Sequence, residues 1–147
     1  MELIARNPAR RRAAHGMATV ETVIVLPLLL MMLFGITEFS LALSRWQAIS
    51  NSAREGARTA IVYRSNCVAT DVEAAVRERV RNYAAPIGIV LSDDQIDVTG
   101  VCGAPDTNST VRVTSPYQFR VLSGFAPSVS PVINLLGTSV MRNEGTG

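Results

Sequence analysis

The sequence has no lysine, a single histidine and only two cysteines. The one histidine, His15, has no second histidine with which to form a metal site. No Ser/His/Asp set, no Cys/His cluster and no glycine-rich phosphate loop is present either. These absences predict that the chain has no catalytic residue, no metal site and no cofactor, and is not an enzyme.

Strong charge is also lacking, since the net charge is only +2. A polyanionic partner such as nucleic acid requires a concentrated basic surface, so we expect none. The only acidic cluster is Asp93, Asp94 and Asp97. It lacks the spaced ligands and closing glutamate of a calcium loop, so we expect a solvated turn there.

Hydrophobic residues, by contrast, make up 48% of the 147 residues, and the excess lies near the N-terminus. Between residues 18 and 39 only Glu21 and Glu38 are ionisable, and about 20 apolar residues span a bilayer core. The segment is too long for an ordinary signal peptide, and no small-residue cleavage site follows it. We therefore expect a retained single membrane span.

A basic leader precedes this span, over residues 1–16. It contains one acid, Glu2, and four arginines: Arg6, Arg10, Arg11 and Arg12. A basic run before an apolar segment keeps that end in the cytoplasm. The sequence therefore predicts a cytoplasmic N-terminus and a C-terminal part outside the cytoplasm.

Two residues inside the span are unusual. Glu21 places a carboxylate among apolar side chains, which costs about 2.5–3.5 kcal/mol in lipid and indicates a function. The alternative is a glutamate at the cytoplasmic rim whose side chain reaches the interface. Pro27 removes a helix hydrogen bond and predicts a kink or local melting. The alternative is a proline that the membrane helix tolerates.

Past Phe39 the apolar residues recur at helical spacing, so we expect one helix that continues to residue 62. Over residues 17–62 it is transmembrane in its first half and about 65 Å long. Small residues near its end, such as Ala53, Gly56 and Ala57, predict close packing of a sheet or a second helix. Trp46 is interpreted as an interfacial anchor or a packing residue.

Residues 63–147 are expected to form a small domain outside the cytoplasm. Thr70 and Glu73 form a capping-box pattern before a helix over residues 71–84. Its expected buried residues are Val72, Ala75, Val76, Val80 and Tyr83. Glu73 and Arg77 have the spacing of an exposed ion pair.

Strands are predicted in the second half of this domain. Residues 95–102 and 110–119 alternate in polarity around a polar loop, which indicates a hairpin. Ser130-Pro131 predicts the start of a short helix that ends at Gly137. Residues 138–143 are predicted to form the last strand. The expected fold class is α+β: a long pilin-like helix packed on a small domain with a short helix and a small antiparallel sheet.

The two cysteines, Cys67 and Cys102, both follow the span and lie on the same side of the membrane. In an oxidising compartment we expect them to form a disulfide. Closing a loop of about 36 residues stabilises a fold by about 4 kcal/mol in the chain-entropy model. The alternative is two buried free thiols.

Four motifs occur in order over about a third of the chain: G-x-A-x-V-E at residues 16–21, V-L-P-L-L-L at 25–30, F-G-I-x-E-F at 34–39 and A-R-E-G-A-R at 53–58. Together they closely resemble the TadE-like pseudopilins of tight-adherence (Flp-type, type IVc) pilus systems. The first motif also resembles a type IV prepilin cleavage site, with glycine before the cut and glutamate as mature residue five.

The resemblance implies that a prepilin peptidase cuts between Gly16 and Met17. Glu21 of one subunit would then pair with the new amino terminus of a neighbour, so that each charge offsets the other's burial. The function implied is a minor pilin or pseudopilin required for pilus assembly at the inner membrane. The implied partners are the peptidase, other minor pilins, the major pilin, the assembly platform and membrane lipid.

A second hypothesis needs no processing. The chain could be an unprocessed single-pass protein that holds a binding or sensor domain outside the cytoplasm. Gly16 and Glu21 distinguish the two hypotheses, because a plain anchor needs neither residue.

Overall fold

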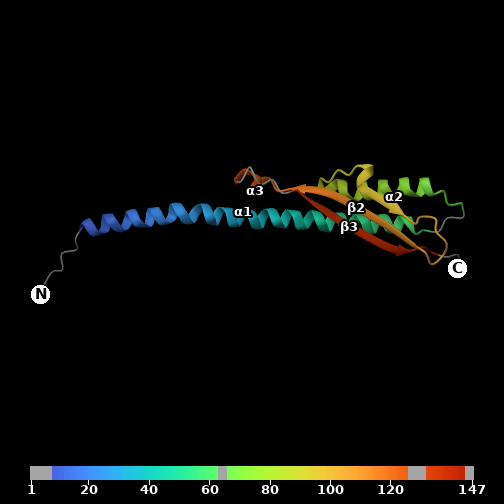
Figure 1. The fold of residues 1–147 in the computed structure, drawn as a ribbon, viewed down its shortest axis with the longest axis horizontal. Coiled ribbons are helices and arrows are strands. Elements are labelled where there is room, and N and C mark those ends of the chain that lie inside the picture. The colour runs from blue at the N-terminus through green and yellow to red at the C-terminus, as the bar shows by residue number, and fades with distance from the viewer. Residues whose placement is uncertain (1–7, 63–65, 126–131, 145–147) are drawn as a thin grey trace.

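A single long helix carries a small α+β domain on its second half (Figure 1). The computed structural model describes residues 8–62, 66–125 and 132–144. Part of the expected basic leader, including Glu2 and Arg6, lies outside these residues, and so does Ser130-Pro131. The α+β class predicted from the sequence is confirmed.

Helix α1 (Pro8–Ala60) begins earlier than predicted and includes Gly16. A proline suits its start because the first helical residues have no backbone N–H partner to lose. The helix continues without a break through Pro27, so the local melting expected there is not seen. The kink at Pro27 stays a prediction.

Helix α2 (Ala69–Ala84) returns along α1 and buries Val72, Val76, Val80 and Ala84. The predicted cap is wrong: Val68 is the N-cap, no side chain caps the helix, and Thr70 lies within its first turn. Tyr83, expected in the core, is exposed. The predicted pair of Glu73 and Arg77 is present, with 3.5 Å between carboxylate and guanidinium.

The sheet has three antiparallel strands in the order β1 (Ile96–Thr99), β2 (Asn108–Gln118) and β3 (Val132–Arg142). The predicted hairpin is confirmed, with Val98 opposite Val111. Its first strand is shorter than expected because the chain turns at Gly100 and Cys102, whose φ angles are +77° and +56°. Two short 3₁₀ turns, η1 (Ala85–Ile87) and η2 (Asp93–Gln95), connect α2 to β1.

The predicted short helix before Gly137 is wrong, because β3 already begins at Val132. Gly137 ends no helix and instead lets the sheet approach α1. A Cβ atom there would lie 2.8 Å from the carbonyl oxygen of Ile49 and 2.9 Å from the Cα of Ser50. The last strand predicted over residues 138–143 corresponds to the second half of β3.

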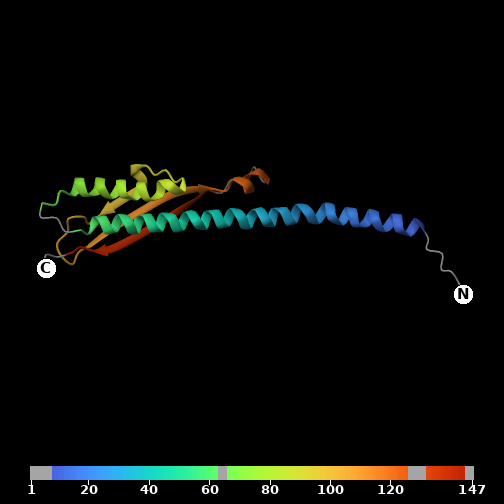
Figure 2. The same ribbon diagram turned by 180° about the vertical axis from the view of Figure 1, so that it is seen from behind.

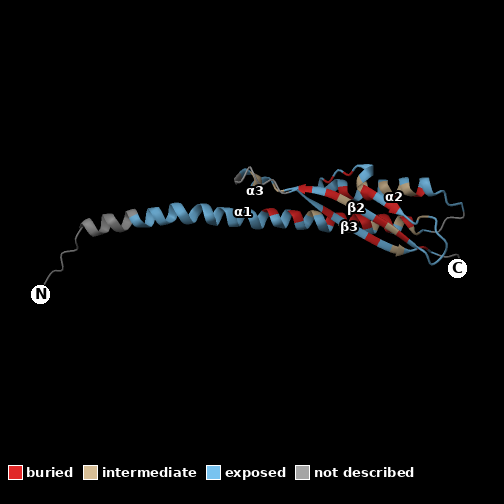
Figure 3. Cartoon of the chain, viewed as in Figure 1, coloured by how far each residue is buried: buried red, intermediate tan, exposed pale blue. Residues whose placement is uncertain are grey.

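The core lies between the sheet and the two helices. Helix α1 packs against β2, β3 and α2, and α2 also packs against β1 (Figures 1 and 2). Ala53 and Ala57 are fully buried, and a Cβ atom on Gly56 would lie 2.6 Å from Val80 Cγ2. The close packing predicted from these small residues is confirmed. Figure 3 shows the buried residues gathered in this half of the molecule.

A short helix, α3 (Arg120–Phe125), follows β2 and was not predicted. It lies beside α1 at the end of the domain nearest the N-terminal half of that helix (Figure 1). It therefore sits where the domain meets the exposed part of α1.

Candidate membrane anchor and processing site

The first functional feature is the part of α1 that leaves the domain. We call residues 17–37 the arm. All of them are exposed (Figure 3), and Glu21 is the only ionisable residue among them. At 1.5 Å per residue the arm is about 30 Å long, which matches the hydrocarbon core of a bilayer.

Among the described helices, α1 alone is long and apolar enough to cross a membrane, over Met17–Ala60. The most apolar 18-residue stretch of that span has a mean hydropathy of 2.2, and none of it is buried by the rest of the chain. A core helix of a soluble domain would be covered. The exposed arm therefore indicates membrane anchoring.

The predicted processing residues lie at the start of the arm. Gly16 and Met17 are both within α1, and the Met17 side chain is 79% exposed. Glu21 follows on the exposed helix, on a face shared with Thr22, Val25 and Leu29. None of the ion pairs found among the described residues includes Glu21.

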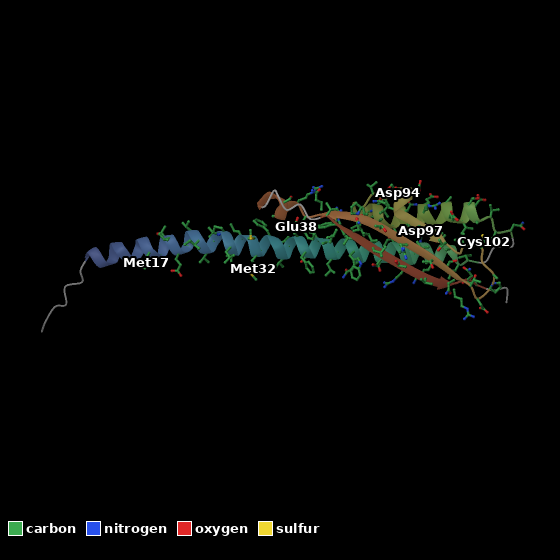
Figure 4. All side chains as sticks on the ribbon, viewed as in Figure 1. Met17, Met32, Glu38, Asp94, Asp97 and Cys102 are labelled. Atoms are coloured by element: carbon green, nitrogen blue, oxygen red, sulfur yellow. A yellow bond between two sulfur atoms is a disulfide. The ribbon has the colours of Figure 1, made fainter. Side chains whose placement is uncertain are left out.

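Glu38 marks the junction between arm and domain. It is only 5% exposed, and its Oε1 atom accepts a hydrogen bond of 2.9 Å from the backbone N–H of Val121 in α3. The Tyr117 hydroxyl donates to the backbone oxygen of Glu38 at 3.4 Å. Figure 4 shows Glu38 at the end of the domain that faces the arm. This carboxylate therefore holds α3 against α1.

The sequence indicated Glu38 only as a second charge in the apolar segment. Its role depends on Val121, which is 83 positions away, and no local pattern reveals such a contact. The one available signal was the F-G-I-x-E-F motif, which contains Glu38.

A groove of about 470 Å³ lies at this junction, between α1 and the segment where β2 passes into α3. We call it the junction groove. Its lining includes Phe34, Glu38, Leu41, Arg45, Arg120 and Val121. The Arg45 guanidinium lies 5.5 Å from the centre of the Tyr117 ring, a cation–π distance that fixes it over the sheet.

Trp46 packs at the free edge of the sheet. Its Nε1–H donates to the backbone oxygen of Leu136 in β3 at 3.0 Å. Of the two roles expected for Trp46, the structure shows the packing role. This bond occupies a backbone group of β3 that has no neighbouring strand.

At the far end of the domain, Cys67 and Cys102 form the expected disulfide, with 5.7 Å between their Cα atoms. Both residues are exposed, so the alternative of two buried thiols is wrong. The bond joins the segment between α1 and α2 to the turn that follows β1.

Several charged residues of the domain form ion pairs. Arg79 donates to Glu55 Oε1 at 2.6 Å, and this bond holds the pKa of the Glu55 carboxyl below its ordinary value. In the acidic cluster, Asp93 pairs with Arg81. The described residues contain no group of three or more His, Cys, Asp or Glu side chains that could hold a metal ion.

Comparison with known proteins places part of the chain beside a known family. Residues 16–58 match the family model described as TadE-like protein. No curated protein and no solved structure matches the chain. The matched segment contains the predicted processing residues, the arm and Glu38, so the resemblance indicated by the four motifs is confirmed over this segment.

Proposed function

We propose that this chain, TadE-like over residues 16–58, is a minor pilin or pseudopilin required to assemble a tight-adherence pilus. A prepilin peptidase processes it between Gly16 and Met17. The observation that carries the proposal is Glu21: an exposed carboxylate in an apolar arm of membrane-spanning length, five residues after a glycine.

Cleavage would create a cationic amino terminus on Met17, four residues before Glu21. In lipid each charge is costly alone, and pairing the Glu21 carboxylate of one subunit with the amino terminus of the next lowers both costs. The arm then serves as an assembly surface that exchanges lipid contacts for contacts with other arms.

The bond that the peptidase would cut lies within a helix, and Gly16 lowers the cost of opening that helix. A protease needs access to the backbone of its substrate, and α1 encloses the bond between Gly16 and Met17 in a helix. Glycine weakens a helix by about 1 kcal/mol relative to alanine and has no side chain to obstruct the peptidase. Gly16 thus makes local unwinding easier at the cut.

The proposed location and partners of the chain follow from the membrane anchor and the family resemblance. The N-terminus lies in the cytoplasm and the domain outside it, anchored in the inner membrane or carried in the pilus. The partners are the peptidase, other minor pilins, the major pilin and the assembly platform. The chain has no catalytic activity of its own.

The mature N-terminus tests the processing step. Intact-mass analysis of protein from cells that contain the peptidase is expected to find Met17 as the first residue. Gly16→Leu is expected to leave the chain uncleaved. The matched control is Gly35→Leu, in the same helix, where an added Cβ meets no atom within 4 Å and cleavage should persist. Finding only uncleaved wild-type chain would refute processing.

A second variant tests the assembly role of the carboxylate. Glu21→Gln keeps the side-chain size and removes the charge, so we expect normal membrane insertion but at least tenfold fewer pili on shearing. The control is Thr22→Val, which removes only a hydroxyl bonded to the Ala18 carbonyl at 2.9 Å. Full piliation with Glu21→Gln would favour the unprocessed anchor of a binding or sensor domain.

A further inference from the structure

We propose that the junction groove binds the headgroup of an anionic phospholipid, in the membrane leaflet on the domain's side of the arm. This inference depends only on insertion of the arm into a bilayer. It does not depend on cleavage by a peptidase or on pilus assembly.

First, the junction groove lies at the depth of the lipid headgroups when the arm is inserted. When residues 17–37 fill the hydrocarbon core, the helix that follows rises through the headgroup layer, which is about 5–8 Å thick on each side. Glu38 and Leu41 lie within about 6 Å of the edge of the core, and the backbone of Arg45 about 12 Å from it. The side chains of a helix tilt toward its N-terminus, and the Arg45 guanidinium packs on Tyr117, whose hydroxyl donates to the backbone oxygen of Glu38, so the charge of Arg45 lies lower than its backbone. Figure 1 shows α3 beside α1 where the arm ends, and Val121 at the start of α3 bonds Glu38. The junction groove is therefore level with lipid headgroups.

The second argument is chemistry. Arg45 and Arg120 both line the groove, and a guanidinium binds a phosphodiester through paired hydrogen bonds. The groove's one carboxylate, Glu38, is buried and already accepts the amide hydrogen bond of Val121. The two cations outnumber it, so the groove favours an anion.

The apolar part of the lining continues the arm. Phe34, Leu41 and Val121 each leave between 39% and 58% of their surface exposed at the groove. Such side chains fit the glycerol backbone and the first methylenes of an acyl chain, with the phosphate above them. A free phosphate ion would leave this apolar surface uncovered, which is why we assign a lipid.

The third argument is the position of the acidic residues. Figure 4 shows Asp94 and Asp97 farther along the domain from the arm than Glu38. Glu55 lies 17 positions beyond Glu38 on α1, about 26 Å farther from the membrane. That distance exceeds the screening length of about 8 Å at physiological salt, so the Glu55 carboxylate does not repel the headgroups.

The first experiment measures depth. The full chain, with its disulfide intact, is reconstituted in nanodiscs of phosphatidylcholine and phosphatidylglycerol and carries one nitroxide label at Val121→Cys, Met32→Cys or Asp106→Cys. Accessibility to oxygen and to a water-soluble nickel chelate gives the depth of each label. We expect Met32 in the hydrocarbon, Val121 at the headgroups and Asp106 in water.

The outcomes of this experiment separate the proposal from its premise. A water-exposed label at Met32 would show that the arm is not inserted. A lipid-embedded Met32 label together with a Val121 label as water-accessible as Asp106 would overturn the lipid site alone.

The second experiment measures lipid preference. Native mass spectrometry of chain released from the same nanodiscs counts bound phosphatidylglycerol against phosphatidylcholine. Each arginine near a membrane surface strengthens anionic-lipid binding about fivefold, so the Arg45→Gln/Arg120→Gln variant is expected to lose at least a fivefold preference. The control is Arg54→Gln/Arg58→Gln, which removes the same charge from α1 farther from the membrane.

Equal binding of both lipids by the wild type, or the same loss in the control, would overturn the proposal. If the double variant melts at a lower temperature than the wild type, the single change Arg120→Gln replaces it. Arg120 is exposed, and its substitution leaves the contact of Arg45 with Tyr117 intact.

Discussion

At the scale of single residues, Glu38 is where an apolar arm becomes a folded domain. Its carboxylate is buried and bonded to the backbone of α3, while the residues before it on the arm are exposed. A lone carboxylate next to a membrane span is easy to find in a sequence. Its partner, Val121, is not easy to find, because Val121 reaches Glu38 only after β2 has crossed the sheet.

Removing this carboxylate should loosen α3. Glu38→Ala leaves the Val121 N–H without its acceptor, and an unsatisfied buried donor costs about 1–3 kcal/mol. We expect faster hydrogen exchange at the Val121 amide and a lower melting temperature. Glu38→Gln retains an acceptor oxygen and should have less than half the effect. Equal exchange rates in all three proteins would show that the bond does not hold α3.

Glu55 provides a pH-dependent prediction. Its pKa is lowered, first by the hydrogen bond from Arg79, so the folded state favours the ionised form. The stability from this pair is present above the pKa of an unfolded glutamate, about 4.3, and is lost as the pH falls through the lower folded value.

Arg79→Gln should therefore raise the pKa of Glu55 toward its ordinary value, as measured by NMR titration of the carboxyl carbon. Arg54→Gln serves as the control, because Arg54 bonds Asn51 and is not a cause of the shift. An unchanged titration in Arg79→Gln would assign the lowered pKa to another group.

At the scale of elements, α1 and β3 approach each other closely at Gly137. Gly137 permits it, since a Cβ atom would meet backbone atoms of Ile49 and Ser50 at 2.8–2.9 Å. Backbone atoms cannot rotate away as a side chain would. The whole strand or helix would have to move.

We therefore expect Gly137→Ala to destabilise the domain by about 1–3 kcal/mol or more through overpacking. Gly35→Ala is the matched control, because nothing lies within 4 Å of an added Cβ there. Thermal unfolding monitored by circular dichroism in detergent compares the two. A Gly137→Ala variant as stable as the control would contradict the close approach of α1 and β3.

The elements that the sequence predicted well are those with local causes. Helical spacing of apolar residues predicted α1 and α2, and alternation around a polar loop predicted the β1–β2 hairpin. The errors share a different cause. Gly137 was interpreted as a helix end. A glycine that ends a helix and a glycine in a strand that lies against a helix look the same in the local sequence.

The candidate site divides in the same way. The arm was predictable, because a membrane span is a local pattern. The processing and assembly roles of Gly16 and Glu21 come from a short motif and stay predictions. The junction groove was not predictable, since its two arginines are 75 positions apart and meet only after β2 has crossed the sheet. Helix α3 has six residues and no strong periodicity, so the sequence did not indicate it.

At the scale of the whole molecule, the domain is held differently at its two ends. The end near the arm depends on hydrogen bonds such as that of Glu38. The far end is closed covalently by Cys67 and Cys102, which are 35 positions apart. A domain of this size has a small core and gains much from such a bond.

Breaking the disulfide should therefore lower stability substantially. In the chain-entropy model the bond contributes about 4 kcal/mol, so Cys67→Ser/Cys102→Ser should lower the melting temperature by more than about 10 °C. A reductant should have the same effect on the wild type and none on the variant. An unchanged melting curve under reductant would show that the bond does not stabilise the domain.

The continuity of α1 has a mechanical consequence. Because the arm and the core helix are one helix with no break, a pull on the arm along its axis is transmitted directly into the domain. Helix α1 would then slide lengthwise past α2 and β3, which loads all of their contacts at once instead of peeling them apart one by one. The domain therefore resists a pull along α1 with all of these contacts together.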